Sequence, residues 1–179
     1  MGVPLMCTAI LMKDKDILKT INNVPSTDYI FHGEKMDLGL HSLQCGRRTD
    51  AVKLWLTWKY YGDIGFEKRI DRLFDLAKYA ESKVRSSKSF KMVSPCESLN
   101  VCFQIQPKEL NQSEWSTFTK NVRNRLVEEG EIMVNYANIG DISCIRLIIV
   151  NFNLRRHHLD TFFEGIETVS KETLRDLFD

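Results

Sequence analysis

The alternation of apolar and polar positions divides the chain into an irregular N-terminal part and a regular C-terminal part. Residues 6–12 are apolar at both parities, which predicts a strand covered on both faces, as in an α/β core. Residues 22–44 show no sustained period and are interpreted as one long loop. Because this loop contains Tyr29, Ile30, Phe31 and Leu43, we expect it to close over another part of the protein.

Two helices are predicted after the loop. Val52, Trp55 and Leu56 fall on one helical face, and Gly62 provides a natural stop. Asp63 is placed to cap the second helix, whose apolar positions repeat at helical spacing as far as residue 84. The polar stretch 86–89 is the best candidate for a domain boundary.

Beyond that stretch the pattern predicts a small α+β layer. Strands are expected at 90–93 and 100–105, and residues 131–136 and 144–150 are expected to pair as a hairpin through a turn at 138–141. Ser113 is expected to cap a helix that Gly130 closes, and the last helix carries apolar residues between 159 and 169. Helices that alternate with an antiparallel sheet define the α+β class.

Composition and charge narrow the classes of function. The chain has 179 residues and a net charge of +1, so there is no electrostatic reason to expect nucleic acid or an anionic membrane as a partner. No apolar run approaches the ~20 residues of a membrane span, and a cytoplasmic protein is expected. The five cysteines are odd in number and lack CxxC spacing, which favours reduced thiols, and the four histidines show no ligand spacing, so no metal site is expected.

Three positions carry candidate chemistry. Arg146 is a cation inside an otherwise apolar strand, which suits either an edge-strand arginine facing solvent or an internal acid, or a fork that holds a carboxylate. Tyr29 is either a proton donor on a closing loop or an aromatic anchor of that loop. Gly46, followed by two arginines, either offers backbone N–H groups to a phosphate or is part of an ordinary helix start.

Three stretches of the chain resemble the group II pyridoxal-phosphate-dependent amino-acid decarboxylases, and most of all the glutamate, cysteine-sulfinate and aspartate branch. They are Met-Gly-Val-Pro-Leu-Met-Cys-Thr-Ala at 1–9, the stretch at 43–59 that contains Gln-Cys-Gly-Arg-Arg, and Asn-Val-Cys-Phe at 100–103. The second is the most specific. Their order and spacing extend the similarity over essentially the whole chain.

The resemblance implies the aspartate-aminotransferase type of fold (fold type I), an α/β enzyme with an α+β C-terminal domain, which works as a homodimer with pyridoxal 5'-phosphate. Residues 1–45 would end the large cofactor domain and include its catalytic loop, 46–86 would be connecting helices, and 87–179 the small C-terminal domain. The lysine that binds the cofactor would lie directly before Met1, so the chain alone is expected to be inactive.

The resemblance also implies roles for the three candidates. Tyr29 would return a proton to the substrate carbon after CO2 leaves, Arg146 would bind a carboxylate of an acidic amino acid, and Gly46 would line the cofactor site, from the neighbouring subunit. The loop between Tyr29 and Gln44 is shorter than in the animal glutamate enzymes, so closure and substrate choice are expected to differ. A non-catalytic binding or regulatory α+β module, or one half of a split enzyme, are the alternatives.

Overall fold

The chain forms two compact units, residues 3–60 and residues 61–179. The structure is a computed structural model that describes residues 3, 7–22, 41–43, 48–130 and 132–178. Each unit is described by itself below.

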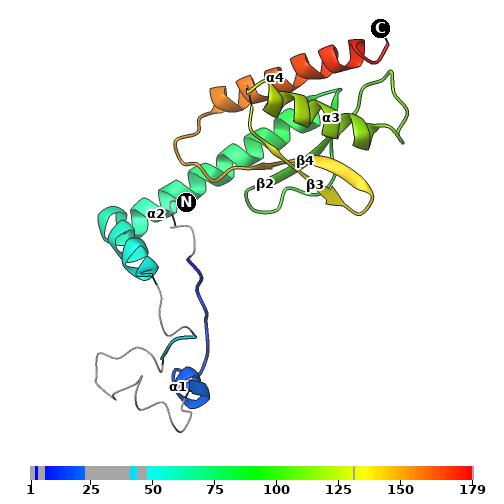
Figure 1. Cartoon of the computed structure of the whole chain (residues 1–179). Coiled ribbons are helices and arrows are strands. Elements are labelled where there is room, and N and C mark those ends of the chain that lie inside the picture. The colour runs from blue at the N-terminus through cyan, green and yellow to red at the C-terminus, as the bar shows by residue number, and fades with distance from the viewer. Residues whose placement is uncertain (1–2, 4–6, 23–40, 44–47, 131, 179) are drawn as a thin grey trace. The chain divides into compact units, whose positions relative to one another are not determined.

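The larger unit is built on a four-stranded antiparallel sheet with the order β1-β2-β4-β3 (Figure 1). The strands are β1 (Phe90–Met92), β2 (Asn100–Ile105), β3 (Asn135–Ile139) and β4 (Ile142–Ile148). The predictions for β1 and β2 are confirmed, β2 with both of its ends. In this order β4 is an interior strand, with β2 on one side and β3 on the other.

The predicted hairpin is confirmed, but its predicted bounds are wrong. Ile139 pairs with Ile142, so the turn consists of Gly140 and Asp141, where a longer turn at 138–141 was expected. The φ of Gly140 is 58°, a conformation that glycine adopts without the steric penalty of a Cβ atom. Because the turn is tight, β3 ends and β4 begins closer to it than the hydrophobic pattern indicated.

Two helices and the part of a third that follows Tyr60 complete this unit: α3 (Trp115–Glu128), α4 (Arg156–Arg175) and α2 (Asp50–Ser86). The predicted break at Gly62 is confirmed as a non-helical residue inside α2, with φ 65° and ψ 179°, a conformation essentially restricted to glycine. The predicted cap at Ser113 is wrong, since the N-cap of α3 is Glu114, whose carboxylate instead accepts hydrogen bonds from Asn111.

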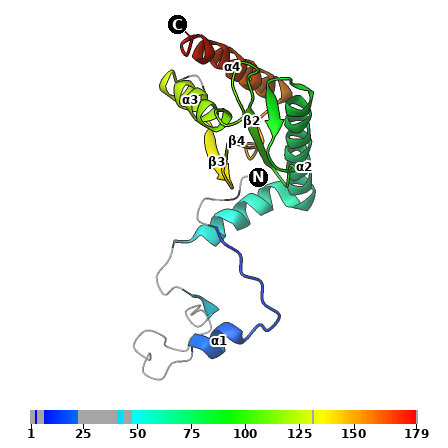
Figure 2. The same ribbon diagram turned by 90° about the vertical axis from the view of Figure 1, so that its right-hand side faces the viewer.

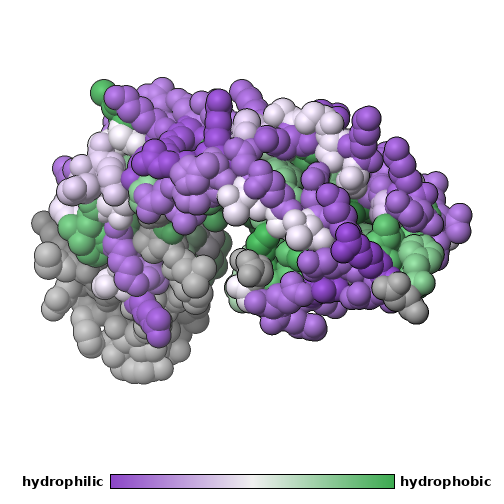
Figure 3. Space-filling view, turned by 90° about the horizontal axis from the view of Figure 1, so that it is seen from above, coloured by the Kyte–Doolittle hydropathy of each residue, from purple (hydrophilic) through white to green (hydrophobic). Residues whose placement is uncertain are grey.

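The helices of the larger unit gather on one face of the sheet (Figures 1 and 2). Alternate residues of the two central strands join them in one core: Val101, Phe103 and Ile105 from β2, and Ile145 from β4. Burial of such side chains contributes about 1.5–3 kcal/mol each. Seen from above, the outer side of the helix layer is mostly hydrophilic (Figure 3). The strand residues of the other parity, which include Arg146, lie on the opposite face, called the open face here.

A polar contact joins α2 to α4 at the edge of this core. The hydroxyl of Tyr79 donates to Oδ1 of Asp160 at 2.6 Å, and Nζ of Lys83 lies 2.6 Å from the same oxygen. The hydrogen bond from Lys83, and then that from Tyr79, lower the pKa of the Asp160 carboxyl below its ordinary value of 3.8. The same contact raises the pKa of Lys83.

This contact predicts a pH-dependent loss of stability in Asp160→Asn. Because the pKa of Asp160 is lower in the folded chain than in the unfolded one, its charge stabilises the fold above the unfolded pKa. That contribution disappears as the pH falls through the folded pKa. Chemical denaturation should therefore show the variant less stable than the parent at pH 7 and equal to it at strongly acidic pH. Asp71→Asn, at an exposed position of α2, is the control and should match the parent throughout.

The smaller unit, residues 3–60, contains the short helix α1 (Ile17–Asn22), which the sequence pattern did not reveal, and the first turns of α2. The predicted strand at 6–12 is wrong for its described residues 7–12, which form no strand. A strand requires neighbours that pair with its backbone, and no described residue pairs with this run. Its apolar side chains are left uncovered, with Leu11 95% exposed. The predicted closing loop falls mostly on 23–40, outside the described residues.

Candidate functional site

Of the three candidate residues, Arg146 is the one that the structure describes. It lies in the middle of β4, on the open face of the sheet, directly opposite Cys102 of β2 and Asn135 of β3. Tyr29 and Gly46 lie outside the described residues. The interpretation of Arg146 as an edge-strand arginine is wrong, because β4 is an interior strand.

The guanidinium of Arg146 has an unmet hydrogen-bonding requirement. Its Nε is buried, and no residue in the described part of the chain accepts a hydrogen bond from it. A buried donor without a partner costs about 1–3 kcal/mol, and more where the group is charged. An acceptor supplied from outside these residues would remove this cost, and a carboxylate matches the planar fork of a guanidinium best.

Two cysteines surround the arginine on the open face. Cys144 precedes it by two residues on β4, and Cys102 faces it from β2. The Cys144 thiol donates to the carbonyl oxygen of Ala137 at 3.4 Å, and the Cys102 thiol donates to Oδ1 of Asn100 at 3.7 Å. Burial raises the pKa of the Cys144 thiol to about 11, with a smaller contribution from the charge and hydrogen bonding of Cys102, so this thiol is neutral at pH 7. The guanidinium therefore lies beside the neutral thiol of Cys144, which brings no negative charge of its own.

The sequence analysis did not predict that these cysteines lie beside Arg146. The spacing of Cys144 and Arg146 by two residues was a usable signal, because strand residues i and i+2 share a face. The pairing of Cys102 with Arg146 needs the register between β2 and β4, strands that are separated by a helix and a hairpin strand.

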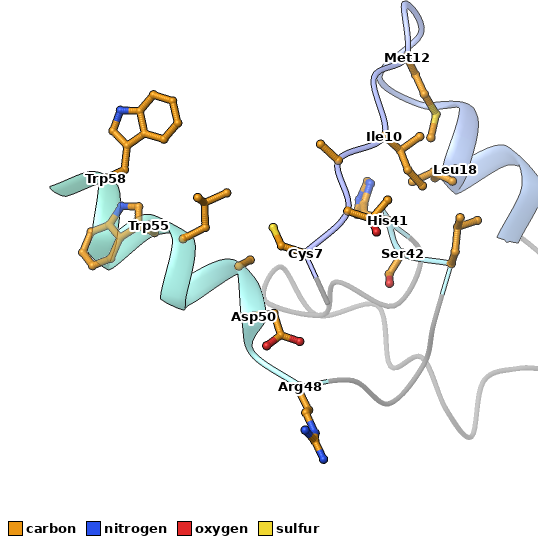
Figure 4. Close-up of a pocket in the computed structure, with 15 residues that line it drawn as sticks. Cys7, Ile10, Met12, Leu18, His41, Ser42, Arg48, Asp50, Trp55 and Trp58 are labelled. Carbon is orange, nitrogen blue, oxygen red and sulfur yellow. The ribbon is translucent and has the colours of Figure 1, made fainter. Parts of the chain in front are cut away.

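The smaller unit contains a hollow of about 1440 Å³ (Figure 4). Residues 7–10, Met12, residues 41–43 and the start of α2 line it, and the lining is mainly apolar, with Ile10, Leu18 and Trp55 among its side chains. The side chain of Asn22, at the end of α1, donates to the carbonyl oxygen of Ser42 at 2.8 Å and ties α1 to the 41–43 segment. Gly46 follows the 41–43 segment, but its own placement is outside the described residues.

The described residues contain neither a cluster of metal-ligating side chains nor a membrane-spanning helix. No group of three or more histidine, cysteine, aspartate or glutamate side chains there is arranged to hold a metal ion. None of the described helices combines the length and the apolar character of a membrane span.

Comparison with known proteins identifies the family. The model of the pyridoxal-dependent decarboxylase conserved domain matches residues 1–106, which is more than half of the chain. The chain belongs to the pyridoxal-dependent decarboxylases. The resemblance inferred from the residues is thereby confirmed.

Two curated relatives are named acidic amino acid decarboxylases. The acidic amino acid decarboxylase GADL1 of Mus musculus is 30% identical over 183 residues, which cover 94% of this chain and 33% of the relative. The protein of the same name from Homo sapiens is 29% identical, with 94% and 35% covered. The chain thus spans about a third of the length of the curated relatives it matches.

A solved decarboxylase confirms the predicted fold class. The crystal structure of mouse CSAD in apo form superposes with a TM-score of 0.76 at 28% identity, covering 88% of this chain and 34% of that one. The chain corresponds to the C-terminal third of the fold type I decarboxylases, and its antiparallel sheet with helices is their small α+β domain.

Proposed function

We propose that the complete enzyme removes the α-carboxylate of an acidic amino acid (glutamate, aspartate or cysteine sulfinate) as CO2. Family membership supports decarboxylation with pyridoxal phosphate, and the names of the relatives support an acidic substrate. The observation that carries the proposal is the buried Nε of Arg146, which has no acceptor among the described residues. An anionic substrate group supplies that acceptor.

The described residues around Arg146 suit the binding of the amino-acid substrate and not the binding of the cofactor. The site offers one cation beside the neutral thiol of Cys144, which is suited to a carboxylate. When bound, pyridoxal phosphate draws off the electron pair of the breaking bond between Cα and the carboxylate. Gly46 would line the cofactor site from the neighbouring subunit, so the proposal includes a homodimer.

Arg146 and Tyr29 have separate roles in the proposed reaction. The fork of Arg146 binds a substrate carboxylate through two parallel hydrogen bonds, which fixes the orientation of the substrate. The hydroxyl of Tyr29 holds a proton and returns it to Cα after CO2 has left. Closure of the loop that carries Tyr29 excludes water, so that this proton comes from the tyrosine.

The proposal extends to the organisation of the enzyme. Residues 1–45 form the end of the large cofactor domain. Residues 46–86 are connecting helices, and residues 87–179 form the small C-terminal domain. The lysine that carries the cofactor belongs to a segment upstream of Met1, and the chain alone is inactive. The enzyme works in the cytoplasm.

Release of CO2 from carboxyl-labelled amino acids tests this function. The complete enzyme with pyridoxal phosphate should act on at least one of glutamate, aspartate and cysteine sulfinate, and much less on leucine or tryptophan. The 179-residue chain under the same conditions is the matched control and should release none. Equal rates on acidic and neutral amino acids would contradict the proposed substrate class, and CO2 release by the chain alone would contradict its inactivity.

A further inference from the structure

Two thiols lie beside Arg146 on the open face of the sheet. Arg146 is the residue to which the proposed function assigns substrate binding. We infer that Cys102 and Cys144 form a floor for the Arg146 side chain and leave its buried Nε–H without an acceptor until a substrate carboxylate supplies one. This inference rests on the proposed function and deepens it. The two cysteines are positioning residues, because they act through Arg146.

The strand register brings the three side chains together. Cys102 and Arg146 are directly opposed, so their Cβ atoms are about 4.5–5.5 Å apart on a common face. Cys144 shares that face with Arg146 and lies diagonally across from Cys102. Each cysteine therefore adjoins the stem of the arginine.

Burial shows that the thiols are covered. Cys102 is 4% exposed and Cys144 is 0% exposed, although the described helices pack on the other face. The Nε of Arg146 is itself buried. These observations agree with an arginine side chain that lies along the sheet over the thiols, with its Nε near them.

The chemistry of sulfur explains why thiols suit this floor. A thiol sulfur is a weak acceptor, whereas a hydroxyl oxygen has two strong acceptor lone pairs. A serine at 102 would occupy nearly the same space but would compete with the substrate for the Nε–H. Both thiol protons have oxygen acceptors, on Asn100 and Ala137. The sulfur lone pairs accept only weakly, so the thiols do not satisfy the Nε–H of Arg146.

A disulfide is a poor alternative use of this pair. Diagonal neighbours on antiparallel strands have Cα atoms about 7–8 Å apart, beyond the usual 4.4–6.8 Å of a disulfide. The raised pKa of Cys144 also makes its thiol unreactive. A positioning role is the use that the geometry favours.

The test measures the Arg146 Nε–Hε resonance in the ¹⁵N-labelled 179-residue chain, assigned by its loss in Arg146→Lys. In the parent chain, glutarate should shift this resonance downfield as its carboxylate binds. In Cys102→Ser the resonance should already be shifted without glutarate, and the Kd for glutarate should rise about threefold to tenfold, as expected when one hydrogen bond must be exchanged for another. Cys96→Ser, which changes a thiol outside the strands, should leave both quantities unchanged.

Separate outcomes decide the floor and the proposed function. A parent-like Nε shift and Kd in Cys102→Ser would overturn the floor. If Cys102→Ser unfolds, judged by circular dichroism, Cys102→Ala decides: faster exchange of the Nε proton with water supports the floor, and an unchanged rate overturns it. If glutarate leaves the parent resonance unmoved while Cys102→Ser still shifts it, the floor stands and carboxylate binding by Arg146 fails.

Discussion

Arg146→Ala in the complete decarboxylase is expected to lower kcat/KM for the proposed acidic substrate by about 100-fold. Loss of one partner from a buried charge-assisted pair costs about 2–5 kcal/mol, and about 2.7 kcal/mol corresponds to a factor of 100. The loss should be large because the guanidinium is an interior-strand group whose buried Nε has no acceptor in the described chain. Steady-state rates of CO2 release measure the effect.

Two further variants sharpen this prediction. Arg146→Lys keeps the charge but loses the planar fork, so it should recover only part of the activity. Arg85→Ala removes an exposed arginine that pairs with Glu81 on α2, and its kcat/KM should equal that of the parent. A normal kcat/KM in Arg146→Ala would remove the substrate-binding role from this residue.

Phe103→Ala is expected to cause the largest loss of stability among single changes in the core. The ring of Phe103 is fully buried, with centroids 5.3 Å from Phe90 and 5.6 Å from Phe163, so it joins β1, β2 and α4. Removal of a buried phenylalanine leaves a cavity and costs about 3–5 kcal/mol. Denaturant titration followed by circular dichroism measures the change.

Phe178→Ala provides the matched control. Phe178 is 66% exposed near the end of the chain, so the same substitution there removes almost no buried surface. Its midpoint should match that of the parent. A loss of stability in Phe103→Ala no greater than in this control would show that Phe103 does not organise the core.

The sequence predicted most of the larger unit because that unit is made of local patterns with clear ends. The alternation in 100–105 marked β2 to the residue, and Gly62 marked the break in α2. The run at 6–12 misled because an apolar stretch predicts a covered strand only when partners exist, and the described residues supply none. The cap of α3 was missed because Ser113 is the commoner cap residue, yet Glu114 occupies the position.

The candidate site was predictable in its residue types but not in its surroundings. A charged residue within the apolar run of β4 pointed to Arg146 from the sequence alone. Its neighbours Cys102 and Asn135 depend on pairing between distant strands, which hydrophobic pattern does not encode. Tyr29 and Gly46 were assigned through the family resemblance, and their roles stay predictions.

The one-sided packing of the sheet has a consequence for how this domain can evolve. Along β2 and β4, residues of one parity meet the helices and determine whether the chain folds, while residues of the other parity surround Arg146. Mutations at the second set change the surroundings of Arg146 with little effect on the core, because neighbouring strand positions point to opposite faces. Selection on the surroundings of Arg146 and selection for a stable fold therefore act on alternate residues of the same two strands.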